Sequence, residues 1–510
     1  MMLIISNREK FIFEDEVRNI RDLQLAFISN RTTKRFFQIL STMERARLFT
    51  IGELAEKIQV TQRTIASDIK YIKDYFGDCI TLVSGSSGFL FEEKKPSIYQ
   101  EKKQEFLENE CLFELIGEIF KGSVSEVDEL AHRYHFSETT FRRLLGNSAT
   151  VLASYGLQWS SSPLTIEGSE ANLRKFFKDF YYEGIDTTYT LVPDPELHEL
   201  ILNQLNNKLG QYEIGSGTTP AAFSYTFYIA IKRASFGFPI TISKDLAELA
   251  YKGKSFSLLY SLNEGIKRLY GIELAKEEFA WIYLVTICKR TLDQTESEKK
   301  FYKQFHQGSE IAQLTDAYLN VFELAKDSRS QIKIFLQSFF LSRKVNHLLS
   351  PVLNKEAQDI KEALMHSDNE NYERKLRFLK ENQRIDFLDT PYIEDICVSL
   401  TIYSDLIFDF YSREKNIYFL LEGDHFICQQ IRTRAIQQFG TKHMLTFLPF
   451  QHLTQEILNE EHIDLIVTNY NRYLLDFIIE TDYLLLKSVP DEQDWQHLER
   501  KIDPYRKPFF

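Results

Sequence analysis

Glycine, proline and cysteine are scarce in this chain, and each shortage narrows the choice of structure. The 510 residues include 20 Gly and 12 Pro against 41 Phe and 26 Tyr, which favours helices with well-filled cores over turn-rich β architecture. The five cysteines show no CxxC spacing. This argues against a disulfide framework or a zinc site and favours reduced thiols in a cytoplasmic protein.

Long apolar runs and an excess of basic charge are also missing. No stretch approaches the roughly eighteen apolar residues of a membrane helix, and the N-terminus carries acids where a signal peptide needs an apolar core. We therefore expect a cytoplasmic protein with no membrane segment. The net charge is −12, so any contact with nucleic acid depends on a local basic face.

The segment 50–76 carries the most informative pattern. Thr50 and Glu53 form a capping box, which predicts a helix from Ile51, and Thr61 is a plausible N-cap for a second helix. A short helix, a tight turn and a second helix make a helix-turn-helix, whose second helix enters the major groove. The apolar stripe of that helix is Ile65, Ile69, Ile72 and Phe76.

Strand-like segments at 79–84 and 89–92 follow across a Gly-Ser turn and predict the wing of a winged helix-turn-helix, with 33–42 as its third helix. The opposite face of the second helix is polar and partly basic. We expect it to bind DNA, with Arg63 as the best candidate for a guanine contact. The predicted contacts are Gln62, Arg63, Thr64, Ser67 and Lys70 in the groove and Lys34, Arg35 and Lys73 at phosphates.

The pattern recurs after a charged stretch at 92–103, which Pro96 breaks and which we interpret as a linker. A helix is predicted over 108–120. Ser125 should cap a helix over 126–134, and Ser137 one over 138–154, interrupted at Gly146-Asn147. Segments 157–160 and 164–167 would form a second wing. The predicted DNA contacts of this second unit are Thr139, Thr140, Arg142 and Arg143.

His132 and His135 lie three residues apart in the second unit, a spacing that invites a metal interpretation. No third ligand lies nearby in the sequence, so we interpret them as surface or turn histidines. Neither a metal nor a cofactor is expected.

The remainder divides into a helical region and a final α/β segment. Two related helical blocks are separated by a polar stretch at 293–300, although one larger helical domain is an alternative. From residue 416, apolar strands at 417–421, 444–448, 463–467 and 483–486 alternate with helices, which predicts a small parallel sheet. We expect a mainly α multidomain protein with domains at 1–95, 104–170, 171–292, 300–412 and 415–506.

This order of domains resembles the Mga/AtxA/RofA-type transcriptional regulators of Gram-positive bacteria. The resemblance is carried by TIGELAEKIQVTQRTIASDIKYI, VDELAHRYHFSETTFRRLL, IEGSEANLRKFF and FYIAIKRASFG. It implies two phosphotransferase-system regulation domains (PRDs) in the helical blocks and a C-terminal domain like the EIIB component. It also implies virulence or metabolic regulation, homodimers formed through the C-terminal half, and histidine phosphorylation by a phosphocarrier protein.

The sequence departs from the family pattern where phosphate would be carried. Thr226, Val285 and Ile402 occupy positions where regulation domains usually carry histidine, which leaves His198 and His347 as candidate phosphorylation sites. The loop 422–425 after the first strand of the C-terminal domain has no Cys. We interpret that domain as an interaction or dimerisation module that has lost phosphotransfer.

These features predict a dimeric DNA-binding regulator rather than an enzyme. Two alternatives stay open at this stage: a phosphotransfer relay, and a helical adaptor that uses its helix-turn-helix folds to bind proteins.

Overall fold

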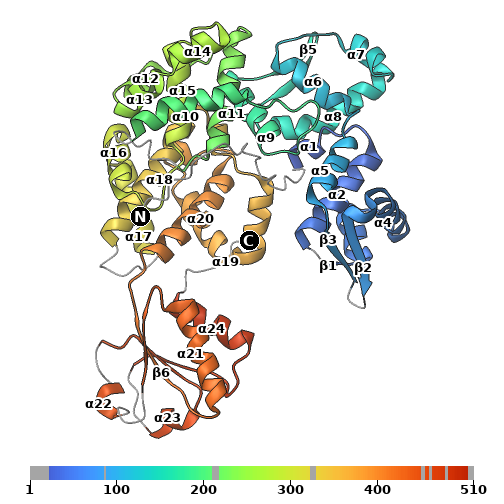
Figure 1. Cartoon of the computed structure of the whole chain (residues 1–510). Helices are drawn as coiled ribbons and strands as arrows, with labels where there is room; N and C mark the ends of the chain where they lie inside the picture. The colour runs from blue at the N-terminus through green and yellow to red at the C-terminus, as the bar shows by residue number, and fades with distance from the viewer. Residues whose placement is uncertain are drawn as a thin grey trace. The chain divides into compact units, whose positions relative to one another are not determined.

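The computed structural model describes residues 22–46, 48–85, 88–209, 217–321, 329–448, 454–458, 462–476 and 481–503 (Figure 1). The chain forms two compact units, Met1–Lys289 with Val345–Asp359, and Arg290–Lys344 with Ile360–Phe510. Among the described residues, no helix combines the length and the apolar character needed to cross a membrane.

The first winged helix-turn-helix follows the predicted plan. Its helices are α2 (Arg31–Ala46), α3 (Ile51–Ile58) and α4 (Gln62–Phe76), and its sheet has the order β1 (Leu48–Phe49), β3 (Gly88–Glu93), β2 (Ile80–Gly85). The Thr50–Glu53 capping box and the Thr61 N-cap are both present. The turn between α3 and α4 places Gln59 in the left-handed region, with φ 59°. The predicted isoleucine stripe is buried against α2 and the sheet.

The prediction of a linker over the charged stretch 92–103 is wrong in part. After residue 95 the stretch forms helix α5 (Pro96–Glu105), which Pro96 opens because proline fits the first helical turn. The buried Lys103 Nζ lies 2.7 Å from Glu44 Oε1, which also accepts from the Tyr99 hydroxyl at 2.6 Å. These contacts to α2 make α5 part of the first winged unit.

The second winged unit contains α6 (Cys111–Phe120), α7 (Val127–Arg133) and α8 (Glu138–Ala153), with the hairpin β4 (Gln158–Ser161) and β5 (Leu164–Glu167). Two details of the prediction are wrong. The cap of α7 is Glu126, in a capping box with Glu129, rather than Ser125. Helix α8 also runs unbroken through Gly146, which is exposed and therefore carries only its intrinsic helix penalty.

The two winged units are an internal repeat with an offset of 76 residues. Helix α7 begins 76 residues after α3, and α8 begins 76 residues after α4. His135 has φ 58°, matching Gln59 in the other turn. A bridge between Ser125 and Leu164 stands where β1 pairs with β3 in the first unit. Residues of α4 and α8 that lie 76 positions apart therefore occupy equivalent places in the two units.

The described N-terminal element packs on the second winged unit, not on the first as its place in the chain suggests. Residues 1–21 lie outside the described residues. The buried Gln24 donates to the carbonyls of Phe180 and Ile185 and accepts from the Ile185 amide. Phe27 packs against Trp159, and also against Phe176 and Phe180 of α9 (Glu170–Tyr182).

A buried ion network joins α9 to the helical region that follows. Arg174 is fully buried and bonds Glu278 through Nη1 (2.6 Å) and Nη2 (3.1 Å), and Glu170 through Nε (2.9 Å). Arg233 bonds the same Glu170 and the carbonyl of Phe120 at the end of α6. Two arginines balance two glutamates, so the network is neutral and each charge has a hydrogen-bonded counter-charge.

The helical region of the first unit contains α10 (Pro195–Leu209), α11 (Pro220–Ser235), α12 (Lys244–Tyr251), α13 (Lys254–Tyr260), α14 (Asn263–Tyr270) and α15 (Lys276–Ile287). The next helices are α16 (Thr295–Phe305), α17 (Glu310–Val321), α18 (Arg329–Leu349), α19 (Gln358–Glu381) and α20 (Ile393–Phe410), and the division between units crosses α18 after Lys344. The predicted polar linker at 293–300 is wrong from Thr295 onward, because α16 begins there.

The C-terminal α/β domain has the predicted parallel sheet, with the order β7 (Met444–Phe447), β6 (Asn416–Leu420), β8 (Leu465–Thr468), β9 (Tyr483–Leu485). Helices α21 (His425–Phe439) and α24 (Glu492–Ile502) pack on one face of the sheet around Trp495. Helix α22 (Gln455–Leu458) and Tyr473 of the unpredicted α23 (Asn471–Asp476) contribute to the apolar cluster on the other face (Figure 1).

Candidate nucleic-acid interface

The outer face of α4 in the first unit is solvent-exposed, with Gln62, Arg63, Ser67 and Lys70 along it and Lys73 one turn further. The cations on this face, Arg63, Lys70 and Lys73, have no carboxylate partner among the described residues. Thr64 is different: it is half-buried and shares a 2.9 Å hydrogen bond with Thr61, so it completes the cap of α4.

Of the two α2 cations predicted at phosphates, Arg35 is bound within the protein and Lys34 is half-buried. Arg35 Nε donates to Asp68 Oδ2 at 2.5 Å and Nη2 donates to Oδ1 at 3.1 Å. The hydrogen bond to Asp68 raises the pKa of Arg35. Asp68 lies on the buried side of α4, so this bidentate pair fixes α4 to α2.

The outer face of α8 in the second unit exposes Thr139, Arg142 and Arg143. Thr140 repeats the role of Thr64: it shares a 2.8 Å hydrogen bond with the N-cap Ser137. Arg142 bonds Glu138 one turn earlier, whereas Arg143 has no carboxylate partner among the described residues.

Both hairpins lack the charge of a phosphate clamp. The segments 80–93 and 158–167 contain no Lys or Arg, and the first carries Glu92 and Glu93. Contacts to the sugar–phosphate backbone of DNA need cationic or neutral donors. The helices therefore carry the cationic part of either surface.

The two candidate phosphorylation sites, His198 and His347, are residues of the first compact unit. His198 lies on α10, half-buried, with Nδ1 3.3 Å from the Ser224 hydroxyl of α11. His347 is half-buried in the last turn of α18. Thr226 is 2% exposed and donates to the Ala222 carbonyl, so its hydroxyl is enclosed within α11.

The loop after β6 lies where an open α/β sheet usually binds ligands, at the carboxyl ends of its strands. Asn469 bridges it by accepting from the Glu422 amide at 2.9 Å and donating to the Glu422 carbonyl at 2.8 Å. Asp424 accepts from the first free amides of α21. Burial, together with Glu422 and Asp424, raises the pKa of the Cys428 thiol. The backbone amides that would cradle a phosphate are therefore already hydrogen-bonded to the side chains of Asn469 and Asp424.

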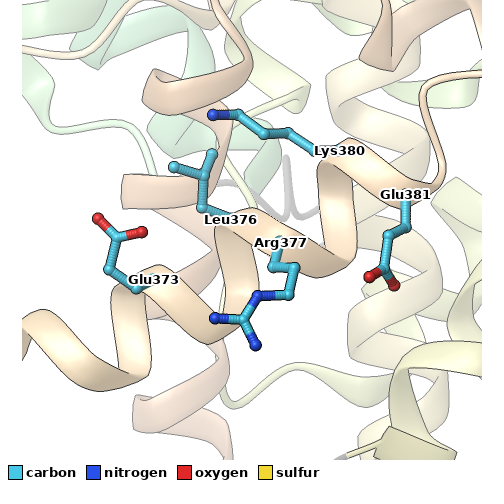
Figure 2. A pocket seen from close by; sticks show the side chains of 5 residues that line it. All are labelled: Glu373, Leu376, Arg377, Lys380 and Glu381. Carbon is cyan, nitrogen blue, oxygen red and sulfur yellow. The ribbon is translucent and has the colours of Figure 1, made fainter.

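Neither the paired histidines of the second unit nor the hollow on α19 has the arrangement of a binding site. His132 and His135 are exposed, and among the described residues no three potential metal ligands gather at one point. A shallow hollow is lined by Glu373, Leu376, Arg377, Lys380 and Glu381, all on α19 (Figure 2). Its two acidic and two basic side chains point away from one another along one helix and do not converge on a common point, unlike the groups of a binding site.

Sequence reasoning missed the contacts that connect the predicted residues to the rest of the protein. Asp68 reads as one more polar residue of a recognition helix, yet it is buried and holds Arg35. Glu138 is not among the predicted DNA contacts, although its spacing of four from Arg142 is the signal for an ion pair on a helix.

Comparison with known proteins independently supports a transcriptional regulator with a helix-turn-helix domain. Residues 98–181 match the family model of the Mga helix-turn-helix domain, a range that runs from α5 through the second winged unit into α9. The capsule synthesis positive regulator AcpB of Bacillus anthracis is 21% identical over 505 residues, covering 92% of this chain and 98% of that protein. A protein of Streptococcus pneumoniae assigned as a trans-acting regulator is 22% identical over 165 residues, 32% of each chain.

The matched domain coincides with the second repeat of the winged fold, and the similarity to AcpB extends over nearly the whole chain. These similarities support a transcriptional regulator of the Mga/AtxA type.

Proposed function

We propose that this regulator binds double-stranded promoter DNA through both winged units. The observation that carries the proposal is the repeated exposed face of α4 and α8, which bears cations without carboxylate partners among the described residues at Arg63, Lys70, Lys73 and Arg143. The groove contacts are Gln62, Arg63, Ser67, Lys70, Thr139, Arg142 and Arg143, with Lys34 and Lys73 at phosphates. Arg35, Thr64 and Thr140 support these faces from inside the protein.

The charge of the chain fits a selective binder better than a general one. With a net charge of −12, the protein as a whole is repelled by phosphates, so binding depends on a few local contacts. Each phosphate neutralised releases counterions and adds about 0.9 to the slope of log affinity against log salt. A small slope together with a clear sequence preference is the expected signature.

The test is binding of the full chain to the region upstream of its own gene, measured by fluorescence anisotropy at several salt concentrations. Arg63→Ala should lose affinity by about 1–3 kcal/mol, the range for an arginine–guanine contact. The matched control is Lys244→Ala, which removes a cation that is 88% exposed on α12, away from both recognition helices. Equal losses in the two variants, or no binding by the parent protein, would reject the groove assignment; the latter outcome would favour a protein-binding adaptor.

We also propose that the C-terminal half forms a homodimer.

We further propose that the helical domains act as PRDs that a phosphocarrier protein phosphorylates. His198 supports the PRD assignment, because its Nδ1 faces the Ser224 hydroxyl on the neighbouring helix while the residue remains half-buried. The test uses phosphoenolpyruvate, enzyme I and the phosphocarrier protein HPr with the parent, His198→Ala and His347→Ala. Label that persists in both variants would place phosphorylation elsewhere.

A phosphotransfer enzyme is the weaker interpretation of the C-terminal domain. The loop at 422–425 has no Cys, and Asp424 occupies the amides at the start of α21. We propose that this EIIB-like domain serves interaction in the cytoplasm, and that surface or virulence genes, suggested by the name of AcpB, are the targets of the protein.

A further inference from the structure

The ion pair between Glu138 and Arg142 has a specific geometry. Arg142 Nε donates to Glu138 Oε1 at 2.8 Å, and Nη2 of the same guanidinium lies 2.8 Å from the same oxygen. The side chains are 52% and 50% exposed, so both are available at the surface of α8. The carboxylate thus occupies only the Nε side of the guanidinium.

The opposite edge of Arg142 remains available for a ligand. A guanidinium has five N–H donors in a rigid plane, and the edge formed by Nη1 and Nη2 matches two acceptors side by side. Guanine presents such a pair, O6 and N7, in the major groove. Because an arginine side chain loses rotamer freedom when it binds, a carboxylate that fixes the plane beforehand lowers the cost of that contact.

The first unit has no such device. At the positions 76 residues before Glu138 and Arg142 it has Gln62 and Ala66. Its exposed arginine, Arg63, corresponds to Thr139 and has no carboxylate partner among the described residues. The two recognition helices therefore present different groups at equivalent positions, although their backbones begin and are capped in the same way.

We propose that Glu138 positions Arg142 to read a guanine, which makes Glu138 a specificity determinant of the second winged unit. Its carboxylate repels phosphate and so keeps the guanidinium on the base edge rather than on the backbone. Because the first unit lacks the pair, the DNA site should contain two unlike halves instead of a direct repeat. This inference depends on the proposed binding to DNA.

The experiment selects duplexes from a randomised library with the full-length parent, Glu138→Ala, Arg142→Ala, and the double variant. The parent should enrich one guanine that Arg142→Ala selects less strongly by about 5- to 150-fold, the equivalent of 1–3 kcal/mol. Glu138→Ala should lose preference at that same base pair while its affinity for random duplex stays equal or rises. The double variant should match Arg142→Ala, because the glutamate acts through the arginine.

The matched control is Arg143→Ala, which removes the neighbouring cation on the same helix. It should weaken binding but keep the preference for the guanine that Arg142 reads. As a second measurement, 7-deazaguanine at the selected position removes the N7 acceptor and should weaken the parent but not Arg142→Ala. Similar melting temperatures for all variants would show that folding is intact.

The outcomes separate this inference from the proposed function. A parent protein that binds no duplex overturns both. If the parent binds selectively while Glu138→Ala keeps the full guanine preference, or loses preference at a different base pair from Arg142→Ala, the inference alone is overturned.

Discussion

The two winged units share one backbone plan but differ in how their recognition helices are held. In the first unit, α4 is fixed to α2 by the bidentate pair of Arg35 and Asp68. In the second, the residues at the equivalent positions are Cys111 and Leu144, both buried. One fold thus has an ion pair where its repeat has two buried, uncharged side chains.

The units also differ in what surrounds them. The second unit receives Gln24 and Phe27 from the N-terminal element, and the buried Arg174 network connects α9 to α11 and α15. The first unit is closed by α5, through Glu44 and Lys103. The second unit is therefore the one joined to the helical region by buried charges.

The largest expected effect comes from breaking that connection. Arg174→Ala leaves Glu278 buried without its main counter-charge, and the loss of one member of a buried pair costs about 3–5 kcal/mol. Urea unfolding followed by tryptophan fluorescence measures it, because the Arg174 guanidinium lies 5.0 Å from the Trp281 ring. Lys267→Ala, at an exposed pair with Glu273, is the control and should leave the midpoint unchanged. Equal midpoints for Arg174→Ala and the parent would show that the network does not stabilise the fold.

A smaller change in the free energy of unfolding is expected when the Arg35–Asp68 ion pair is replaced by apolar side chains. Arg35→Met leaves Asp68 buried and unpaired and should cost about 1–3 kcal/mol. The double variant Arg35→Met/Asp68→Leu, which copies the apolar character of the second unit, should recover stability to within about 1 kcal/mol of the parent, because well-packed apolar residues can replace a buried pair. Chemical denaturation of the three proteins is the measurement. If the double variant is less stable than Arg35→Met, apolar side chains cannot replace the ion pair at these positions of the first unit.

Prediction from sequence succeeds for features that depend on neighbours in the chain. The capping box at Thr50, the cap at Ser137 and the strands of the final sheet are confirmed, because each depends on residues within a few positions. The errors lie where a charged stretch becomes a helix by packing. Lys103 suggests a solvated linker in the sequence, yet it is buried against Glu44, a residue 59 positions away.

The candidate site shows the same limit. The exposed faces of α4 and α8 follow from helical periodicity, and the structure exposes Arg63, Lys70 and Arg143 as expected. Periodicity does not tell which cations are already bound within the protein. Arg35 meets Asp68 from another helix, 33 residues away, and no local pattern encodes that meeting.

The two units should also differ in how their helices α4 and α8 contribute to the salt dependence of DNA binding. Lys73→Ala removes a cation at a position where the second unit has the exposed Ala149. The salt slope of DNA binding should fall by about 0.9, which corresponds to the loss of one phosphate contact. Substituting Ala149→Lys should raise the slope by a similar amount if α8 lies along DNA as α4 does. An unchanged slope in both variants would mean that this part of the helices does not face phosphates.

The smallest expected effect concerns the contact between the segment that precedes the first unit and the start of the second. The Glu110 carboxylate accepts from the Ser29 amide at 2.6 Å and from its hydroxyl at 2.7 Å, and burial raises its pKa above the ordinary value. A raised carboxyl pKa means that the folded state binds the proton more tightly than the unfolded state. The stability contributed by this group is therefore complete below the ordinary glutamate pKa, about 4.3, and is lost as pH rises through the higher folded pKa.

Glu110→Gln should remove this pH dependence at a cost below about 1 kcal/mol, because the amide oxygen can still accept both bonds. Urea midpoints of parent and variant across the mildly acidic range measure the difference, and parallel curves for the two proteins would show that Glu110 carries no such linkage.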